Sequence, residues 1–170
     1  MRLDKAAHWV ERFVFPLNGV THRVGLAILL LMMFLTVGDV VGRYFFTLPI
    51  PGTFELTNFM LALVVFFSVG YTQIRRGHIS IDVIVSRFSP RTQAIIDSIT
   101  YLFSLGLFSL VTWQSAVHAN RLFEGHNVSG ILSLPIYPFL IAVAFGSLLF
   151  CVVMLVDLLS SLAKVVKHEL

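Results

Sequence analysis

The sequence predicts an all-α integral membrane protein with four transmembrane helices, from its composition and the length of its apolar runs. Of its 170 residues, 57% are hydrophobic and only 12% are charged, whereas a soluble domain carries about 25% charged residues. Four runs are long enough to cross the hydrocarbon core, which takes about 20 mostly apolar residues in a helix. The composition excludes a soluble enzyme and a disordered tail, and we expect one membrane domain over residues 1–170.

Charge and cysteine content narrow the class further. The formal net charge of +3 comes from 12 Lys and Arg against 9 Asp and Glu, so it reflects scarce acids rather than a nucleic-acid-binding basic stripe. The single cysteine, Cys151, lies in an apolar run and offers neither a disulfide framework nor a thiolate metal cluster. We therefore expect no nucleic-acid partner, no catalytic residue, no metal and no cofactor.

The apolar runs predict helices over residues 24–46, 53–74, 90–120 and 135–163. Each contains a long stretch without Asp, Glu, Lys or Arg, and the longest covers residues 125–156. A backbone in lipid must satisfy its own hydrogen bonds, which favours helices over buried strands. Turn and cap residues mark the beginnings of the last three helices: Gly52 and Thr53, Ser89 and Pro90, and Ser133 and Pro135.

Two further segments are predicted to lie on the membrane surface as amphipathic helices, one in the N-terminal arm 1–23 and one at 79–88. An apolar face beside charged residues is typical of helices in the membrane interface. In the arm, Pro16 and Gly19 are expected to end a helix whose apolar face consists of Ala6, Trp9, Val10, Phe13 and Val14. In the second segment the apolar face follows the i, i+3, i+4, i+7 spacing, with Ile81, Ile84, Val85 and Phe88.

The distribution of basic residues predicts the orientation. Ten of the twelve Lys and Arg residues lie before the first run, between the second and third runs, or after the fourth. Only Arg43 and Arg121 lie on the other side. Cytoplasmic segments carry the excess of Lys and Arg. We therefore expect both termini in the cytoplasm, and the turn 47–52 and the loop 121–134 on the outer side, which is the periplasm in a bacterium.

A specific pattern surrounds the second and third runs. Residues 75–97 have the sequence RRGHISIDVIVSRFSPRTQAIID, a Gly-His-x-x-x-Asp segment followed by an Arg-x-x-Pro-Arg-like entry to the third helix. Upstream, GRYFF ends the first run, Pro49 follows, and Glu55 opens the second run. The positions that carry the downstream pattern are Gly77, His78, Asp82, Arg87, Pro90 and Arg91.

The order and spacing of these motifs over about residues 38–97 resemble the DctQ-like small membrane subunit of tripartite ATP-independent periplasmic (TRAP) transporters. The resemblance implies a separate, larger membrane subunit that holds the substrate and sodium sites, and a periplasmic binding protein that delivers the substrate. It also implies sodium-driven uptake of an organic acid, such as a C4-dicarboxylate or sialic acid. The chain would then be a multi-pass protein of the bacterial inner membrane that acts as a fixed scaffold.

Two groups of charged residues are candidate structural or partner-interface sites. Asp39 and Arg43 are four residues apart on the first helix and can pair, and Glu55 across the turn is a second candidate partner for Arg43. At the opposite side, His78 and Asp82 are also four apart, which favours a local hydrogen bond. Charged groups inside a membrane are costly unless paired, so we expect the first cluster to hold helices or a partner together.

Two other functions compete with the scaffold hypothesis. The first is a stand-alone dimeric antiporter of four helices that exchanges a small solute for protons through Asp39. The second is a membrane anchor of a redox enzyme, in which His118 ligates haem, although no second histidine lies at a similar depth. The basic residues around 75–91 would also attract lipid head groups, whichever function is correct.

Overall fold

The computed structural model describes residues 2–75 and 90–167, with side chains described for 14–75, 92–93 and 95–159. It contains helices α1 (Arg2–Phe46), α2 (Thr53–Ile74), α4 (Pro90–Glu124) and α5 (Tyr137–Lys167). All four are long and apolar enough to cross a membrane. The prediction of an all-α protein with four spans is confirmed, while the predicted surface helix at 79–88 lies outside the described residues.

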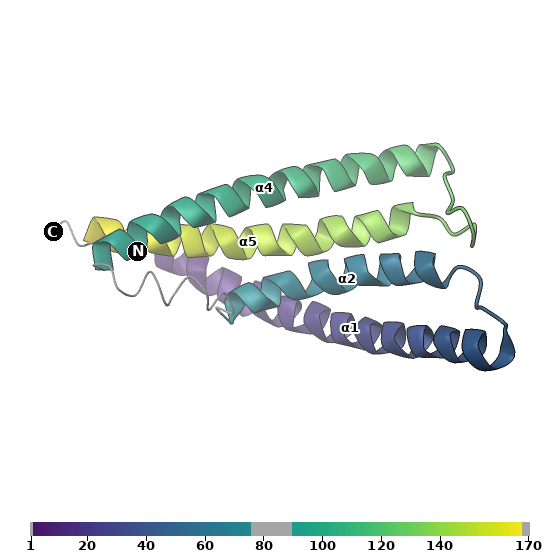
Figure 1. Cartoon of the computed structure of the whole chain (residues 1–170). Helices are drawn as coiled ribbons and strands as arrows, with labels where there is room; N and C mark the ends of the chain where they lie inside the picture. Colours follow the sequence, from purple (N-terminus) through teal and green to yellow (C-terminus); the bar gives the residue numbers. More distant parts are fainter. Residues whose placement is uncertain (1, 76–89, 168–170) are drawn as a thin grey trace.

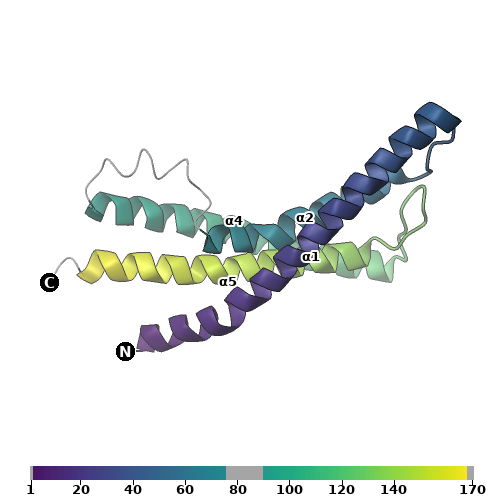
Figure 2. The ribbon, with the colours of Figure 1, turned by 90° about the horizontal axis from the view of Figure 1, so that it is seen from below.

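The helices form a row in the order α4, α5, α2, α1 (Figure 1). α5 packs against both α4 and α2, α2 packs against α1, and α1 makes a smaller contact with α5 as it crosses the row obliquely (Figure 2). We call the end with both chain termini the terminal end, and the end with the turn 47–52 and the loop 125–136 the loop end. α5 is the most buried of the four helices, so the core of the protein surrounds it.

Close backbone approach holds α5 against α2. A Cβ atom added at Gly146 would lie 2.5 Å from the carbonyl oxygen of Phe66, so this position accepts no side chain without a shift. One residue later, Ser147 is completely buried, and its hydroxyl accepts a hydrogen bond of 2.9 Å from Thr112 of α4. Small residues therefore let α5 contact both neighbours at once, as is common between helices in membranes.

α1 and α2 meet through small and polar residues as well. A Cβ at Gly25 would lie 3.0 Å from the hydroxyl of Ser68, and one at Gly70 would overlap the side-chain oxygen of Asn18. The side chain of Asn18 is almost fully buried and donates to the carbonyl of Val14 at 2.9 Å. Asn18 thus uses the backbone of its own helix as its hydrogen-bond partner.

The expected end of the arm helix at Pro16 and Gly19 is wrong, because α1 continues through both residues. A proline inside a helix removes one hydrogen bond and bends the helix, but the chain can stay helical on both sides. The N-terminal part of α1 departs from the axis of the remainder (Figure 2). The arm and the first span are therefore one bent helix rather than two.

The observed ends of the last two helices also differ from the predicted ones. α4 extends to Glu124 rather than to residue 120, and α5 covers Tyr137–Lys167 rather than 135–163. Polar residues continue α4 beyond its apolar run, since helix formation does not stop where hydropathy falls. At the start of α5, the carbonyl of Ile136 accepts bonds from the amides of Phe139 and Leu140, so regular helix begins after Pro135.

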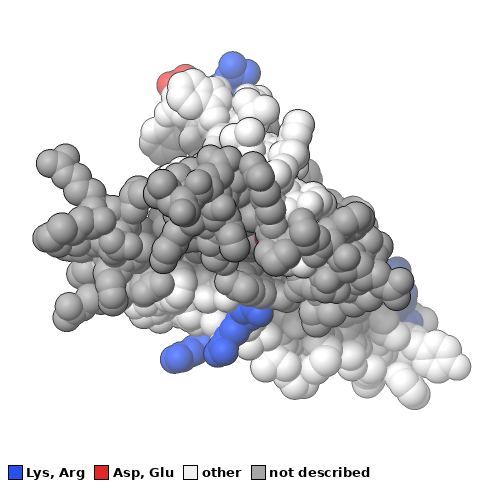
Figure 3. Space-filling model, turned by 90° about the vertical axis from the view of Figure 1, so that its left-hand side faces the viewer, with Lys and Arg blue, Asp and Glu red and all other residues white. Residues whose placement is uncertain are grey.

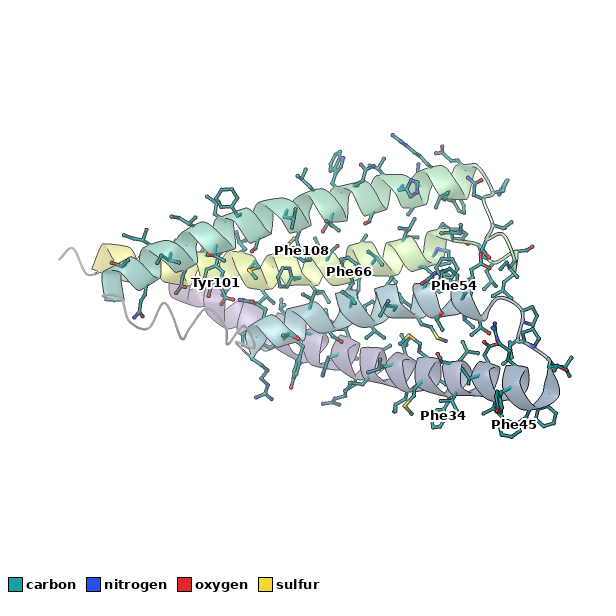
Figure 4. The ribbon with its side chains drawn as sticks, in the orientation of Figure 1. Phe34, Phe45, Phe54, Phe66, Tyr101 and Phe108 are labelled. Carbon is teal, nitrogen blue, oxygen red and sulfur yellow. The ribbon has the colours of Figure 1, made fainter. Side chains whose placement is uncertain are left out.

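Large apolar side chains cover much of the outside. Phe34 and Phe45 of α1 point away from the other helices and are 67% and 71% exposed (Figure 4). Seen from the terminal end, the described surface is mostly uncharged, with basic side chains in a few separate places (Figure 3). A surface of this kind is suited to lipid or to other membrane helices.

The α2–α5 contact gives a stability prediction. Gly146→Ala is expected to lower the free energy of unfolding by about 1–3 kcal/mol, because the added methyl group meets a backbone carbonyl that cannot rotate away. Gly106→Ala on α4 is the matched control, since a Cβ there meets nothing within 4 Å. Thermal unfolding of both variants in detergent tests this, and equal melting temperatures would contradict it.

Candidate functional site

An ion pair lies near the loop end of α1. Asp39 and Arg43 are one helical turn apart, and an Arg43 guanidinium nitrogen lies 2.8 Å from Asp39 Oδ2. The Asp39 side chain is only 10% exposed, while the Arg43 side chain is 66% exposed. The predicted pairing is therefore confirmed, and the arginine extends outward from the acid that it neutralises.

The second oxygen of Asp39 holds the turn that follows α1. Asp39 Oδ1 accepts a hydrogen bond of 2.8 Å from the backbone amide of Ile50. The chain reaches this position because Thr47 adopts a left-handed conformation with φ of 52°, and the amide of Leu48 then donates to the carbonyl of Gly42 at 3.1 Å. A Cβ at Gly42 would lie 2.9 Å from the Leu48 carbonyl, so the tight turn requires glycine there.

Glu55 ties the loop between α4 and α5 to the first turn of α2. Its Oε1 accepts from the amide of Gly130 and its Oε2 from the amide of Leu132, both at 3.0 Å. Gly52 has a left-handed conformation with φ of 80°, and a Cβ atom there would overlap the side chain of Leu132. A carboxylate in the first turn of a helix is also favoured by the helix dipole. The loop end thus joins both helical hairpins.

The loop itself has internal bonds that make it compact. The amide of Ser129 donates to the Leu134 carbonyl at 2.8 Å, and the Leu134 amide donates to the Ser129 hydroxyl at 3.1 Å. Val128 and Pro135 form an isolated antiparallel bridge. The loop therefore presents one defined surface beside the start of α2.

A second polar cluster lies toward the terminal end, and the sequence did not predict it. The His22 ring stacks on the Tyr71 ring with centroids 4.3 Å apart, and His22 Nδ1 lies 3.3 Å from the Ser68 hydroxyl. The guanidinium of Arg75 lies 5.4 Å from the Tyr71 ring centroid, and its Nε donates to the Tyr71 hydroxyl at 3.1 Å. These contacts join α1 to the end of α2.

A buried amide–carboxylate contact links α2 to α5 in the same region. Gln73 is 4% exposed, and its Nε2 donates to Asp157 Oδ2 at 2.9 Å. The Gln73 oxygen Oε1 is buried without a hydrogen-bond partner. These two residues are 84 positions apart, and each lies at the end of an apolar run, so nothing in the sequence pairs them.

The remaining predicted site residues have different outcomes. Of the two candidate partners for Arg43, the structure pairs it with Asp39, while Glu55 holds the loop through Gly130 and Leu132. Pro90 is the first residue of α4 and Arg91 the second, but their side chains lie outside the described part. Four further positions lie in the undescribed stretch 76–89: Gly77, His78, Asp82 and Arg87.

The chemistry available in the described residues is structural. Both Asp39 oxygens and both Glu55 oxygens accept hydrogen bonds from groups that fix the fold. Within the stretches that the structure describes, no group of three His, Cys, Asp or Glu side chains could hold a metal ion. The fold and this site define a multi-pass helical membrane protein whose charged groups hold helices and loops together.

A comparison with protein families gives the particular family. Residues 32–164 match the model described as the DctQ component of tripartite ATP-independent periplasmic transporters. Since this match covers well over half of the chain, the chain belongs to that family and is a transporter component rather than an enzyme. Searches of curated proteins and of solved structures give no match.

The Glu55 contacts predict how the loop depends on α2. Glu55→Ala removes two hydrogen bonds to a charged acceptor, each worth about 1.5–3 kcal/mol. Amide exchange in residues 125–134 should therefore accelerate by about 10²- to 10⁴-fold if both bonds are lost. Glu124→Ala is the control, because the hydrogen bond of Glu124 in the described part of the chain stays within α4, from Asn120. Unchanged loop exchange in Glu55→Ala, measured by mass spectrometry, would contradict the assigned contacts.

Proposed function

We propose that this chain is the small membrane subunit of a TRAP permease that takes up an organic acid. It pairs with a separate, larger membrane subunit that carries the substrate and sodium sites, and a periplasmic binding protein delivers a substrate of the C4-dicarboxylate or sialic acid class. The chain supports the larger subunit as a fixed body while the transport domain moves. The observation that carries this proposal is the family match over residues 32–164.

The arrangement of the helices supports this mechanical task. A carrier of anions needs convergent polar groups or interrupted helices near mid-membrane. Here α2, α4 and α5 are continuous, and the carboxylates of Asp39, Glu55 and Asp157 are engaged in the contacts above. The helices form a row with two broad apolar faces, so lipid and a partner both have access to them (Figure 1).

The ion pair gives no support to the antiporter alternative. A carboxylate that exchanges protons and solute must be able to change partners during the cycle. Each oxygen of Asp39 instead has a donor at 2.8 Å, one from Arg43 and one from the Ile50 backbone. The match to a transporter family likewise gives no support to the hypothesis that the chain is a membrane anchor of a redox enzyme.

The proposal includes an orientation in the bacterial inner membrane. Both chain termini lie at the same end of the molecule, which is consistent with their predicted cytoplasmic location (Figure 1). The loop end then faces the periplasm, where the loop 125–134 is within reach of the binding protein. On the cytoplasmic side, the partner contacts would involve the motif residues Gly77, His78, Asp82, Arg87, Pro90 and Arg91.

Reconstitution tests the proposed function. In proteoliposomes with an inward sodium gradient, uptake of labelled succinate or sialic acid should require this chain, the larger subunit and the binding protein together. This chain alone should transport neither solute. Transport by this chain alone would favour the antiporter, and full-rate uptake without this chain would reject a supporting role.

Assembly should depend on the Asp39–Arg43 pair more than substrate binding does. Arg43→Ala leaves a nearly buried carboxylate without its counter-charge, which costs on the order of a few kcal/mol in a membrane. We expect a several-fold lower yield of the complex with the larger subunit, and an unchanged KM for uptake by the complex that remains. Arg121→Ala, at the end of α4, is the control. A stable, intact Arg43→Ala complex that is inactive in transport would contradict this prediction.

A further inference from the structure

A groove between α1 and α2 extends from the loop end toward the middle of the membrane. Its volume is about 500 Å³, and both helices and the turn between them contribute to it. The residues that matter for its chemistry are Met32, Thr36 and Arg43 of α1, and Thr57, Asn58 and Leu61 of α2. The Asp39–Arg43 pair discussed above lines the mouth of this groove, and the functions discussed above do not use its deeper part.

The length of the groove matches one leaflet of a bilayer. Met32 and Arg43 are eleven residues apart, which is about 16 Å along a helix. The hydrocarbon core is about 30 Å thick, so one leaflet contributes about 15 Å. Arg43 lies at the loop end, and Met32 and Leu61 lie at the deep end. The charged side chains of the groove therefore lie at the depth of lipid head groups, and Met32 and Leu61 lie at the depth of acyl chains.

The polar mouth has donors for a phosphate group. Arg43 carries five N–H donors, and a guanidinium nitrogen contacts Asp39 while the side chain stays 66% exposed. α2 begins at Gly52 without a side-chain cap, so the positive end of its dipole faces the mouth. Asn58 adds an exposed amide about 7 Å further along α2, at a depth suited to an ester carbonyl.

The carboxylate of the ion pair decides which head group fits. Asp39 lines the groove beside Arg43, so the mouth carries one negative and one positive charge. A purely anionic head group gains little there, because Asp39 offsets the charge of Arg43. A zwitterionic head group places its phosphate on Arg43 and its ammonium toward Asp39, so both of its charges meet opposite charge.

The walls of the groove suit an acyl chain. An acyl chain is much narrower than a helix, which is about 10 Å in diameter. The hydroxyls of Thr36 and Thr57 already donate to the carbonyls of Met32 and Thr53, so the wall below the mouth presents no free hydroxyl donor to a chain.

We propose that this groove holds one zwitterionic phospholipid of the phosphatidylethanolamine type. Its phosphate contacts Arg43 and the first turn of α2, and one acyl chain lies along Thr36, Met32 and Leu61. The lipid fills the space between α1 and α2 and becomes part of the fixed body. The site does not involve the substrate, and it shares Arg43 with the ion pair on which assembly is proposed to depend.

Lipid retention on the purified full-length chain tests the proposal. The chain is equilibrated in nanodiscs with equal amounts of phosphatidylethanolamine and phosphatidylglycerol, extracted in mild detergent, and analysed by native mass spectrometry. We expect one retained phosphatidylethanolamine for each chain. Leu61→Trp, which fills the groove and keeps the ion pair, should reduce retention at least tenfold. Leu107→Trp, at an exposed position on α4, should leave retention unchanged.

A second pair of variants tests the head group. Arg43→Gln should abolish the preference for phosphatidylethanolamine, whereas Arg121→Gln should preserve it. Equal retention in Leu61→Trp and Leu107→Trp, or equal binding of both lipids to the unmodified chain, would overturn the proposal. So would a disulfide between Asn58→Cys and a helix of the larger subunit in the assembled complex. Co-purification of the larger subunit with each variant reports separately on the proposed function.

Discussion

The contact of Gly146 with the Phe66 carbonyl is the constraint on which the arrangement of the four helices depends. Lipid tails are as apolar as leucine, so burial of apolar surface does not drive helices together in a membrane. Close approach and hydrogen bonds between helices must do so instead. α5 makes both kinds of contact, through Gly146 to α2 and through Ser147 to Thr112 of α4. Without α5, the hairpin of α1 and α2 would lose contact with α4.

Carboxylates at the loop end hold the turn between α1 and α2 and the loop between α4 and α5, which the packing of the helices does not fix. Asp39 joins α1 to the turn through the Ile50 amide, and Glu55 joins α2 to the loop through Gly130 and Leu132. In each case a backbone amide that would need water finds an acceptor in the protein. These two acidic residues therefore lie where the chain reverses direction, near the end of α1 and the beginning of α2.

The sequence predicted the parts of the fold that depend on local pattern. Apolar runs located four helices, and the i, i+4 spacing identified the pair of Asp39 with Arg43. The contacts of Glu55 were not predictable, because its partners are backbone amides 75 and 77 residues away whose position depends on the loop conformation. The predicted end of the arm helix at Pro16 was wrong for a related reason. A proline changes the direction of a helix, but tertiary contacts decide whether the helix continues.

A body held in this way is suited to resist motion rather than to undergo it. Transporters that alternate between states use broken helices or rocking units around a central site. In the described stretches, the bend in α1 belongs to its N-terminal part, while α2 and α5 are joined near mid-membrane by Gly146 and toward the terminal end by Gln73 and Asp157. Relative movement of α2 and α5 would expose Gln73 and separate it from its acid. Because such movement would be costly, this chain is better suited to be the fixed partner of a moving subunit than to move itself. A lipid in the groove between α1 and α2 would make the contact of these two helices rigid as well.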